Sequence, residues 1–324
     1  MITTSSEKNL GLHPVYAAMC EEHAKRPPIS SVPIAELRAG ADAAAKQRTP
    51  SFPEVHTVEK KITVNGREID VIILRPLGTE TTELPVILYL HGGGWVFCSR
   101  YTHGKAIHDL CIKGQMAVVF VEYSLAPEAT FPIAHEECYS TLQWLVDNHA
   151  SLYLNPNKIA LAGDSAGANI VAGLSIVAKQ RGLHAIKAQV LIYPPITGER
   201  EKFESYHLYG NGDYMLTREE GAYFSKLYFV KPVSDLQHVF ASPDIATKEE
   251  LSGLPPTLVI TAECDILRDE GEAYARQLTE AGVDAAAVRI VGTIHSFFSA
   301  AIETPQYLHT LGLILHHVNR AFSI

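Results

Sequence analysis

Hydrophobic residues follow different rhythms on either side of Val55. Before it, residues 13–26 and 34–48 carry apolar positions at helical spacing, separated by a proline-bearing stretch, which predicts two short amphipathic helices. After it, β-branched residues alternate on both sides of Asn65-Gly66, a dipeptide that suits a type I′ turn because both central residues need a positive φ. We therefore expect an antiparallel hairpin after the two helices.

The rest of the chain alternates short, almost wholly apolar segments with helical patterns. The segments expected to be strands are 85–92, 116–124, 158–164, 188–195, 256–263 and 285–292. Strands that are apolar on both faces and are followed by helices form parallel sheets covered on both sides. With the hairpin included, the sequence predicts an α/β fold with an eight-stranded, mostly parallel sheet and helices on both faces.

One interval, from about Thr197 to Pro243, interrupts this alternation. No strand is indicated there, but aromatic side chains are dense. They are Phe203, Tyr206, Tyr209, Tyr214, Tyr223, Phe224, Tyr228 and Phe229. The interval therefore predicts an insertion in the sheet-forming part of the chain.

Composition and charge exclude several classes of protein. Apolar residues make up 47% of the 324 residues and charged residues 19%, as in packed globular proteins. A net charge of −9 without a basic block argues against nucleic-acid binding. No apolar run approaches the roughly 18 residues of a transmembrane segment, and the first 14 residues lack the pattern of a secretory leader. Five scattered cysteines without metal-ligand spacing favour free thiols and a cytoplasmic location.

Candidate chemistry begins where the segment 158–164 ends in the motif GDSAG and a helical pattern follows. A serine on a sharp strand-to-helix turn, here Ser165, exposes its Oγ, and the next N–H group lies at a helix N-terminus where it can face an oxyanion. The flanking glycines allow close approach of the backbone. A glycine-rich turn without catalytic function, or a phosphate-binding turn, stays an alternative at this point.

A second motif, HGGGW, begins at His91, at the end of the expected strand 85–92. Three consecutive glycines cost backbone entropy, so we expect a function that requires accessible N–H groups and a backbone that is free in φ. An oxyanion hole supplies that need, because its donors must come within about 3 Å of the tetrahedral oxygen. A nucleotide-binding loop is disfavoured, since neither a GxGxxG pattern nor a P-loop lysine follows. We interpret His91 as a residue that organises this loop rather than as a base.

Two later segments offer partners for a serine nucleophile, which needs an imidazole base and a carboxylate that orients the base. In hydrolase folds these follow the serine in the order acid, then histidine. The acids at the end of a later strand are Glu263, Asp265 and Asp269, and His295 is the histidine that directly follows the next strand. Further histidines lie in a C-terminal helical pattern and are expected at its surface or end: His309, His316 and His317.

The motifs HGGGW, GDSAG, AECDILRDEG, GTIHSF and VEYSLAPEATFPIAHEECY together resemble the hormone-sensitive-lipase family of α/β-hydrolases, a group of carboxylesterases. The resemblance runs from about Val55 to the C-terminus. It implies that Ser165 is the nucleophile, Asp265 the acid and His295 the general base of a catalytic triad.

The resemblance also implies the surroundings of the triad. Gly93, Gly94 and Ala166 match the family's oxyanion donors, and a cap built from an N-terminal segment and an insertion covers the site. The expected division of the chain is cap helices at 1–52, core at 53–196, cap insertion at 197–243 and core at 244–324. Trp95 and Phe97, directly after the glycines, are expected to line an apolar substrate pocket, while most cap aromatics are expected to pack the cap on the core.

The expected activity is hydrolysis of a small-molecule ester of short to medium acyl chain, with no cofactor and no metal. Titratable neighbours at 135–137 and 316–317 are expected on exposed polar faces rather than around an ion. Two alternatives stay open. One is an amide substrate, and the other is ligand binding as in gibberellin receptors, which resemble this family but lack the triad histidine. The sequence leaves a homodimer, through an exposed helix or the edge strand, undecided.

Three positions depart from the family pattern. Ser124 stands where the family usually has arginine, Ile266 where it has proline, and Ser296 where it often has glycine. None of these changes removes a reacting group. We expect the first to change how the loop after the fourth strand is held, and the last to alter hydrogen bonding beside His295.

Overall fold

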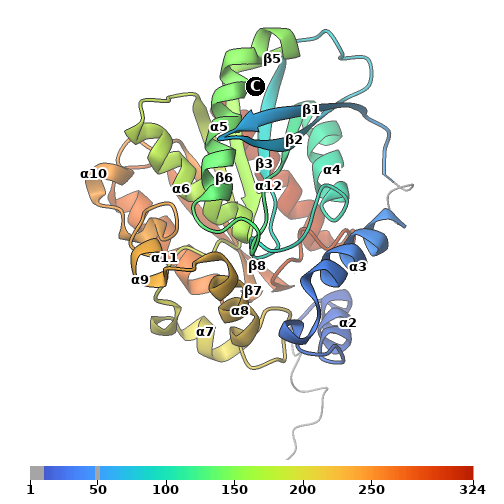
Figure 1. Cartoon of the computed structure of the whole chain (residues 1–324), viewed down its shortest axis with the longest axis vertical. Coiled ribbons are helices and arrows are strands. Elements are labelled where there is room, and N and C mark those ends of the chain that lie inside the picture. Colours follow the sequence, from blue (N-terminus) through green and yellow to red (C-terminus); the bar gives the residue numbers. More distant parts are fainter. Residues whose placement is uncertain (1–10, 48–51, 324) are drawn as a thin grey trace, which may run out of the picture.

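The computed structural model describes residues 11–47 and 52–323. The expectation about a leader sequence falls mostly on residues 1–10, which lie outside the described residues. Eight strands form one sheet in the order β1-β2-β4-β3-β5-β6-β7-β8 (Figure 1). They are β1 (His56–Val64), β2 (Arg67–Arg75), β3 (Leu84–Leu90), β4 (Ala117–Glu122), β5 (Leu154–Asp164), β6 (Ile186–Ile192), β7 (Thr257–Cys264) and β8 (Ala285–Ile294). In this described sheet β2 alone runs against its neighbours, so the predicted eight-stranded, mostly parallel sheet is confirmed.

The hairpin of β1 and β2 turns where the sequence predicts. Asn65 and Gly66 have φ values of 50° and 79°, and Val64 pairs with Arg67 across the turn. Positive φ at both central residues is the requirement of a type I′ turn. The dipeptide therefore sets the register of the first two strands.

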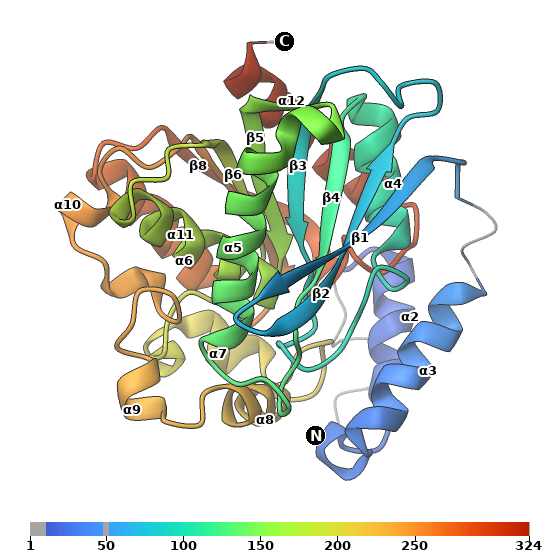
Figure 2. The ribbon, with the colours of Figure 1, turned by 45° about the horizontal axis from the view of Figure 1, so that its top comes forward.

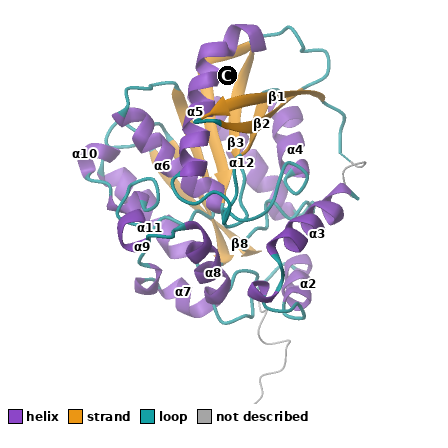
Figure 3. Ribbon diagram, viewed as in Figure 1, coloured by secondary structure: helices purple, strands orange, loops and turns teal. Residues whose placement is uncertain are grey.

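Helices cover both faces of the sheet (Figure 3). One face carries α5 (Ile133–Asn148), α6 (Ala166–Gln180) and α11 (Arg268–Glu280). The other carries α4 (Gly104–Gly114) and α12 (Pro305–Phe322). Neighbouring residues of β4 show why the strands are apolar throughout, because Val119 packs in the first core and Phe120 in the second.

Two further groups of helices lie together at one end of the sheet (Figures 1 and 2). The N-terminal group is α2 (Pro14–His23), η1 (Ile29–Ser31) and α3 (Ile34–Lys46). The group between β6 and β7 is η4 (Arg200–Lys202), α7 (Glu204–Tyr209), α8 (Arg218–Tyr228) and α9 (Pro232–Asp235). The two short elements that follow, η5 (Pro243–Ile245) and α10 (Lys248–Leu251), contact α6 and α11 instead. We call residues 196–242 the cap insertion. The two predicted N-terminal helices are present, although the end of the second, at Arg48, lies outside the described residues.

Helix α2 is fastened to the far end of the chain. The N–H of His13 donates to the carbonyl of Gly292 (3.0 Å), and the hydroxyls of Tyr16 and Thr304 are 2.6 Å apart in a buried hydrogen bond.

Among the described residues, no helix combines the length and the apolar character that a membrane span requires.

Candidate active site

The candidate nucleophile lies on the sharp turn between β5 and α6. Ser165 has φ 50° and ψ −123°, a conformation that costs a non-glycine residue energy and persists only where its surroundings fix it. Its N–H donates to the carbonyl of Ile192 on β6 (2.8 Å), which holds the turn against the neighbouring strand. The side chain is 9% exposed and lines a cavity. The turn therefore presents the serine hydroxyl instead of packing it away.

The glycines of GDSAG are required by close backbone contacts. A Cβ on Gly167 would lie 2.0 Å from the carbonyl oxygen of Leu90 on β3, and one on Gly163 would lie 2.7 Å from the carbonyl oxygen of Gly167. Both obstacles are backbone atoms, which cannot move aside as a flexible side chain could. These contacts let the first turn of α6 approach the end of β3.

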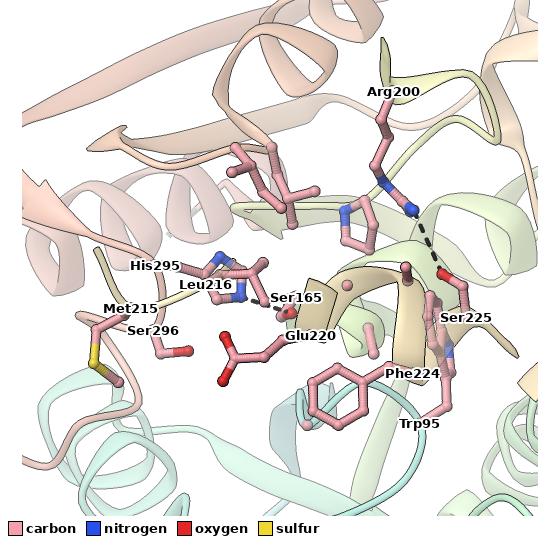
Figure 4. Close-up of a pocket in the computed structure, with 18 of the residues that line it drawn as sticks. Trp95, Ser165, Arg200, Met215, Leu216, Glu220, Phe224, Ser225, His295 and Ser296 are labelled. Atoms are coloured by element: carbon pink, nitrogen blue, oxygen red, sulfur yellow. Dashed lines mark hydrogen bonds between the residues drawn. The ribbon is translucent and has the colours of Figure 1, made fainter. Parts of the chain in front are cut away.

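Ser165, His295 and Asp265 form one line of hydrogen bonds, of which Figure 4 shows the one between Ser165 and His295. Oγ of Ser165 lies 2.9 Å from Nε2 of His295, and Nδ1 of the same ring lies 2.7 Å from Oδ2 of Asp265. Asp265 is 1% exposed and its other oxygen accepts the N–H of Leu267 (3.0 Å). Asp265 and His295 directly follow β7 and β8, so the ends of three parallel strands deliver the three side chains.

The structure separates Asp265 from the other two candidate acids. Glu263 accepts the N–H of Gly292 (2.7 Å), and Asp269 accepts the N–H of Ser205 in the cap insertion (2.8 Å). Each of these carboxylates therefore has a different partner, and the one beside the imidazole is Asp265.

Three N–H groups near the serine have no acceptor among the described residues. The loop after β3 is wound tightly, because Val96 and Phe97 both donate to the carbonyl of Gly93. In the described part of the chain, no hydrogen bond uses the N–H of Gly93, Gly94 or Ala166, and all three residues line the same cavity as Ser165. The arrangement leaves these donors available for a negatively charged oxygen.

His91 contacts the glycine loop and the residue Tyr123. Its ring stacks on Tyr123 with centroids 4.2 Å apart, and its Nδ1–H donates to the carbonyl of Gly92 (2.7 Å). Burial lowers the pKa of His91 to about 3, so the ring stays neutral. These contacts agree with the interpretation of His91 as a loop-organising residue.

A buried ion pair under the loop was not predicted from the sequence. Oδ1 of Asp164 accepts the N–H of Gly92 and the hydroxyl of Tyr89, both at 3.0 Å, and Nε2 of His103 lies 3.0 Å from the same oxygen. Burial favours the neutral carboxyl, but the charge of His103 and the hydrogen bonds from His103 and Tyr89 together outweigh it and lower the pKa of Asp164. For His103 burial likewise opposes the charge, and Asp164 raises its pKa. Asp164 lies inside GDSAG, yet no signal in the sequence links it to His103.

The cavity in front of the serine has a volume of about 730 Å³. Its wall includes Trp95 (Figure 4), Phe97, and apolar side chains from both of these helical groups. Those side chains include Ile29, Leu37, Met215, Leu216 and Phe224. The N-terminal helices and the cap insertion therefore roof one pocket.

A carboxylate joins the two parts of this roof. Glu220 on α8 lies 3.2 Å from Nε2 of His23 on α2, and its other oxygen accepts the N–H of Thr217 in a capping box. Burial opposes the charge of Glu220, but these partners lower its pKa. The side chain projects into the cavity (Figure 4), a position that the sequence alone does not reveal.

Several expectations about polar residues are wrong. His135 and Glu137 are 0% and 2% exposed rather than part of a polar face, and His317 is buried with Nε2 3.1 Å from the carbonyl of Pro256. Glu137 accepts both the N–H and the hydroxyl of Ser124, at 2.7 and 2.8 Å. The loop after β4 is thus held by a serine and a carboxylate at the position where the family has arginine.

The other two departures, Ile266 and Ser296, line the cavity. Ile266 is buried, and its carbonyl accepts the hydroxyl of Ser205 (3.1 Å). Ser296 has φ 65°, a left-handed conformation that favours glycine and explains why glycine is common there.

Among the described residues, no group of three or more His, Cys, Asp and Glu side chains is arranged to hold a metal ion.

Known proteins resemble this chain over most of its length. A family model described as the alpha/beta hydrolase fold matches residues 87–299. An arylesterase of Saccharolobus solfataricus is 32% identical over 283 residues, which are 87% of this chain and 90% of the relative.

Solved structures give the same result. A fungal esterase from Rhizomucor miehei is 47% identical, with a TM-score of 0.93 over 97% of this chain and 99% of the other. A hyperthermophilic esterase from Pyrobaculum calidifontis is 35% identical, with a TM-score of 0.89 over 97% of this chain and 100% of the other. The chain therefore belongs to the α/β-hydrolases, and among them to the hormone-sensitive-lipase family that its motifs resemble.

Proposed function

We propose that the chain is a serine carboxylesterase that hydrolyses short- to medium-chain acyl esters through an acyl-enzyme on Ser165. The chain is a carboxylic ester hydrolase, which its family and its esterase relatives support. The observation that carries the serine mechanism is the line of 2.9 and 2.7 Å contacts from Ser165 through His295 to Asp265.

The carboxylate fixes the proton on the imidazole. Nδ1–H of His295 donates to Asp265, so Nε2 is left as the acceptor that faces Ser165. When Oγ attacks the ester carbonyl carbon, its proton passes to Nε2 and the carbonyl electron pair moves onto oxygen. Asp265 then stabilises the charged imidazole without taking the proton itself.

The tetrahedral intermediate collapses in the direction of the alcohol. The bond to the leaving oxygen breaks, that oxygen takes the proton from Nε2, and Ser165 keeps the acyl group. Water then attacks the acyl carbon and gives a proton to Nε2, and the acid leaves as Oγ regains that proton. In both steps the N–H groups of Gly93, Gly94 and Ala166 donate to the oxyanion, a contribution of about 10²-fold to 10³-fold in rate per donor.

The cavity supports an apolar substrate of limited length. Its wall is largely apolar, with Trp95 and Phe97 next to the oxyanion loop, and about 730 Å³ is a volume typical of small-molecule sites.

No step of this mechanism requires a metal. We therefore expect full activity in EDTA, and a complete loss that zinc restores would contradict the mechanism.

Hydrolysis of p-nitrophenyl esters of increasing acyl length tests this function. We expect cleavage of the short and medium chains and none of the longest. Ser165→Ala should lower kcat by about 10⁶-fold, because the nucleophile is lost.

The matched control is Ser175→Ala on the same helix, where the hydroxyl donates only to the backbone of Val171. It should retain wild-type activity. Cleavage of amides but not of esters would reassign the chain as an amidase. A folded wild type that binds such compounds but cleaves none would indicate a binding protein.

A further inference from the structure

A buried histidine that takes no part in the proposed chemistry connects the nucleophile helix with the cap. Nδ1 of His135 on α5 lies 2.8 Å from the hydroxyl of Tyr228 at the end of α8, and Nε2 lies 3.2 Å from Oδ1 of Asn169 on α6. All three side chains are at most 1% exposed. Three elements far apart in the sequence therefore meet at one imidazole.

The hydrogen-bond partners determine the tautomer of this imidazole. The amide nitrogen of Asn169 donates to two carbonyls, those of Pro195 (2.9 Å) and Ala241 (2.8 Å), so its oxygen must be the atom that faces His135. Nε2 of His135 therefore carries the hydrogen, and Nδ1 accepts the hydroxyl hydrogen of Tyr228. Burial lowers the pKa of His135 to about 3, so this neutral form is constant over the working pH range.

Asn169 connects the cap with the nucleophile. Its N–H donates to the carbonyl of Ser165 (3.1 Å), which places it one helical turn beyond the serine. Of the two acceptors of its side chain, Pro195 directly precedes the cap insertion and Ala241 lies near its end. One amide thus fixes both ends of the cap insertion to the first turn of α6.

Tyr228 carries the connection onward to the oxyanion loop. Its ring stacks on Trp95 with centroids 5.0 Å apart and planes 5° from parallel. One turn earlier on α8, Phe224 packs so closely on Gly94 that a Cβ there would lie 2.5 Å from its ring. The position of α8 therefore determines how the loop with the N–H groups of Gly93 and Gly94 is supported.

We propose that His135 is a positioning residue for the esterase reaction, because it holds α8 against the oxyanion loop and ties it through Asn169 to the nucleophile helix. The inference rests on the proposed serine mechanism. In this role His135 makes no contact with the substrate. Its contribution is to the stabilisation of the oxyanion, so it should affect kcat and leave substrate affinity nearly unchanged.

Two variants remove the connection to different extents. Tyr228→Phe deletes the hydroxyl but keeps the ring on Trp95, and His135→Leu deletes both hydrogen bonds. Each should lower kcat by about tenfold, with KM within about twofold of wild type. His135→Gln can donate to Asn169 and accept from Tyr228, and it should restore most of the activity.

Two measurements separate positioning from simple loss of folded protein. Titration with diethyl p-nitrophenyl phosphate counts the serines that react, so kcat is expressed per reactive site. A trifluoromethyl ketone forms an adduct whose oxygen is an oxyanion, and its affinity should fall by the same factor as kcat. Tyr307→Phe is the control, since it also removes a buried hydroxyl hydrogen bond, to Asp109 (2.7 Å), but on the opposite face of the sheet.

The outcomes are distinct. Wild-type kcat per site and ketone affinity in Tyr228→Phe and His135→Leu would overturn the proposal, as would a higher KM with unchanged kcat. If His135→Leu fails to fold, Tyr228→Phe and His135→Gln decide. A wild type that the phosphate ester does not label would instead overturn the serine mechanism itself, before any variant is compared.

Discussion

At the scale of single residues, Asp164 shows how much of the site depends on a side chain that does not react. One carboxylate oxygen accepts from Gly92 and Tyr89 and lies beside His103, so it connects the glycine loop, β3 and the residue that precedes α4. The residue directly precedes Ser165. A defect at Asp164 should therefore disturb both the nucleophile turn and the oxyanion loop.

Asp164→Asn should lower the free energy of unfolding by about 3 kcal/mol, because it leaves His103 buried without its charged partner. Urea unfolding measures the loss. The double variant with His103→Gln replaces the ion pair by two neutral amides, and it should lose less than the sum of the two single variants. Strictly additive losses would show that the pair is not coupled.

At the scale of elements, the geometry of the site depends on the contact between α6 and the end of β3. Gly167 allows that contact, since its Cα faces the carbonyls of Leu90 and His91. The helix could not start at Ala166 in its present place with a larger residue at this position. The nucleophile turn is therefore determined as much by the neighbouring strand as by its own sequence.

Gly167→Ala should destabilise the protein by about 3 kcal/mol or more and abolish most activity, because the added Cβ meets backbone on two sides. Gly312→Ala on α12 is the matched control, since nothing lies within 4 Å of its added Cβ. That change should stabilise the helix by about 0.5–1 kcal/mol. Thermal unfolding and ester hydrolysis of both variants test the contrast, and equal effects would contradict it.

Much of this element-level structure follows from local pattern. The inner strands β3 to β7 are recognisable because both of their faces are buried, so each contains a nearly continuous apolar run. The order of β3 and β4 in the sheet has no such signal, since each strand matches the same pattern. The predicted exposure of His135 and Glu137 is wrong for a related reason. Both lie in a polar run, HEE, and their partners come from other segments of the chain. His135 bonds to Asn169 and Tyr228, and Glu137 to Ser124.

At the scale of the whole molecule, the first turn of α11 fastens the cap insertion to the core. Arg268 donates to the hydroxyl of Tyr209 (2.9 Å), Asp269 accepts from Ser205, and Glu270 accepts the N–H of Ile196 (2.6 Å). The same turn begins just after Asp265. The attachment of the cap insertion and the position of Asp265, the acid of the proposed triad, therefore depend on neighbouring residues of the chain.

Glu270 makes this fastening dependent on pH. Burial raises the pKa of Glu270 to about 7, against the opposing charge of Arg200, so the folded protein binds a proton that the unfolded chain has released. Between about pH 4.5 and 7 the folded state holds more protons than the unfolded state, and the contribution of this group to stability falls as pH rises.

Glu270→Gln should remove that fall. Its melting temperature relative to wild type should increase from pH 5.5 to pH 8, by an amount equivalent to on the order of 2 kcal/mol. Glu272→Gln is the control, because Arg289 lowers the pKa of Glu272 despite burial and the group stays ionised over this range. A difference that stays constant with pH in both variants would rule out the titration of Glu270.

The attachment of α2 affects how the protein is made. A ribosome synthesises His13 and Tyr16 long before their partners, Gly292 and Thr304, and Thr304 follows Tyr16 by 288 residues. Contacts over such a distance in sequence form late in folding. The growing chain must therefore carry α2 undocked until β8 and the segment that follows it have been made, and the cavity in front of Ser165 is completed only then.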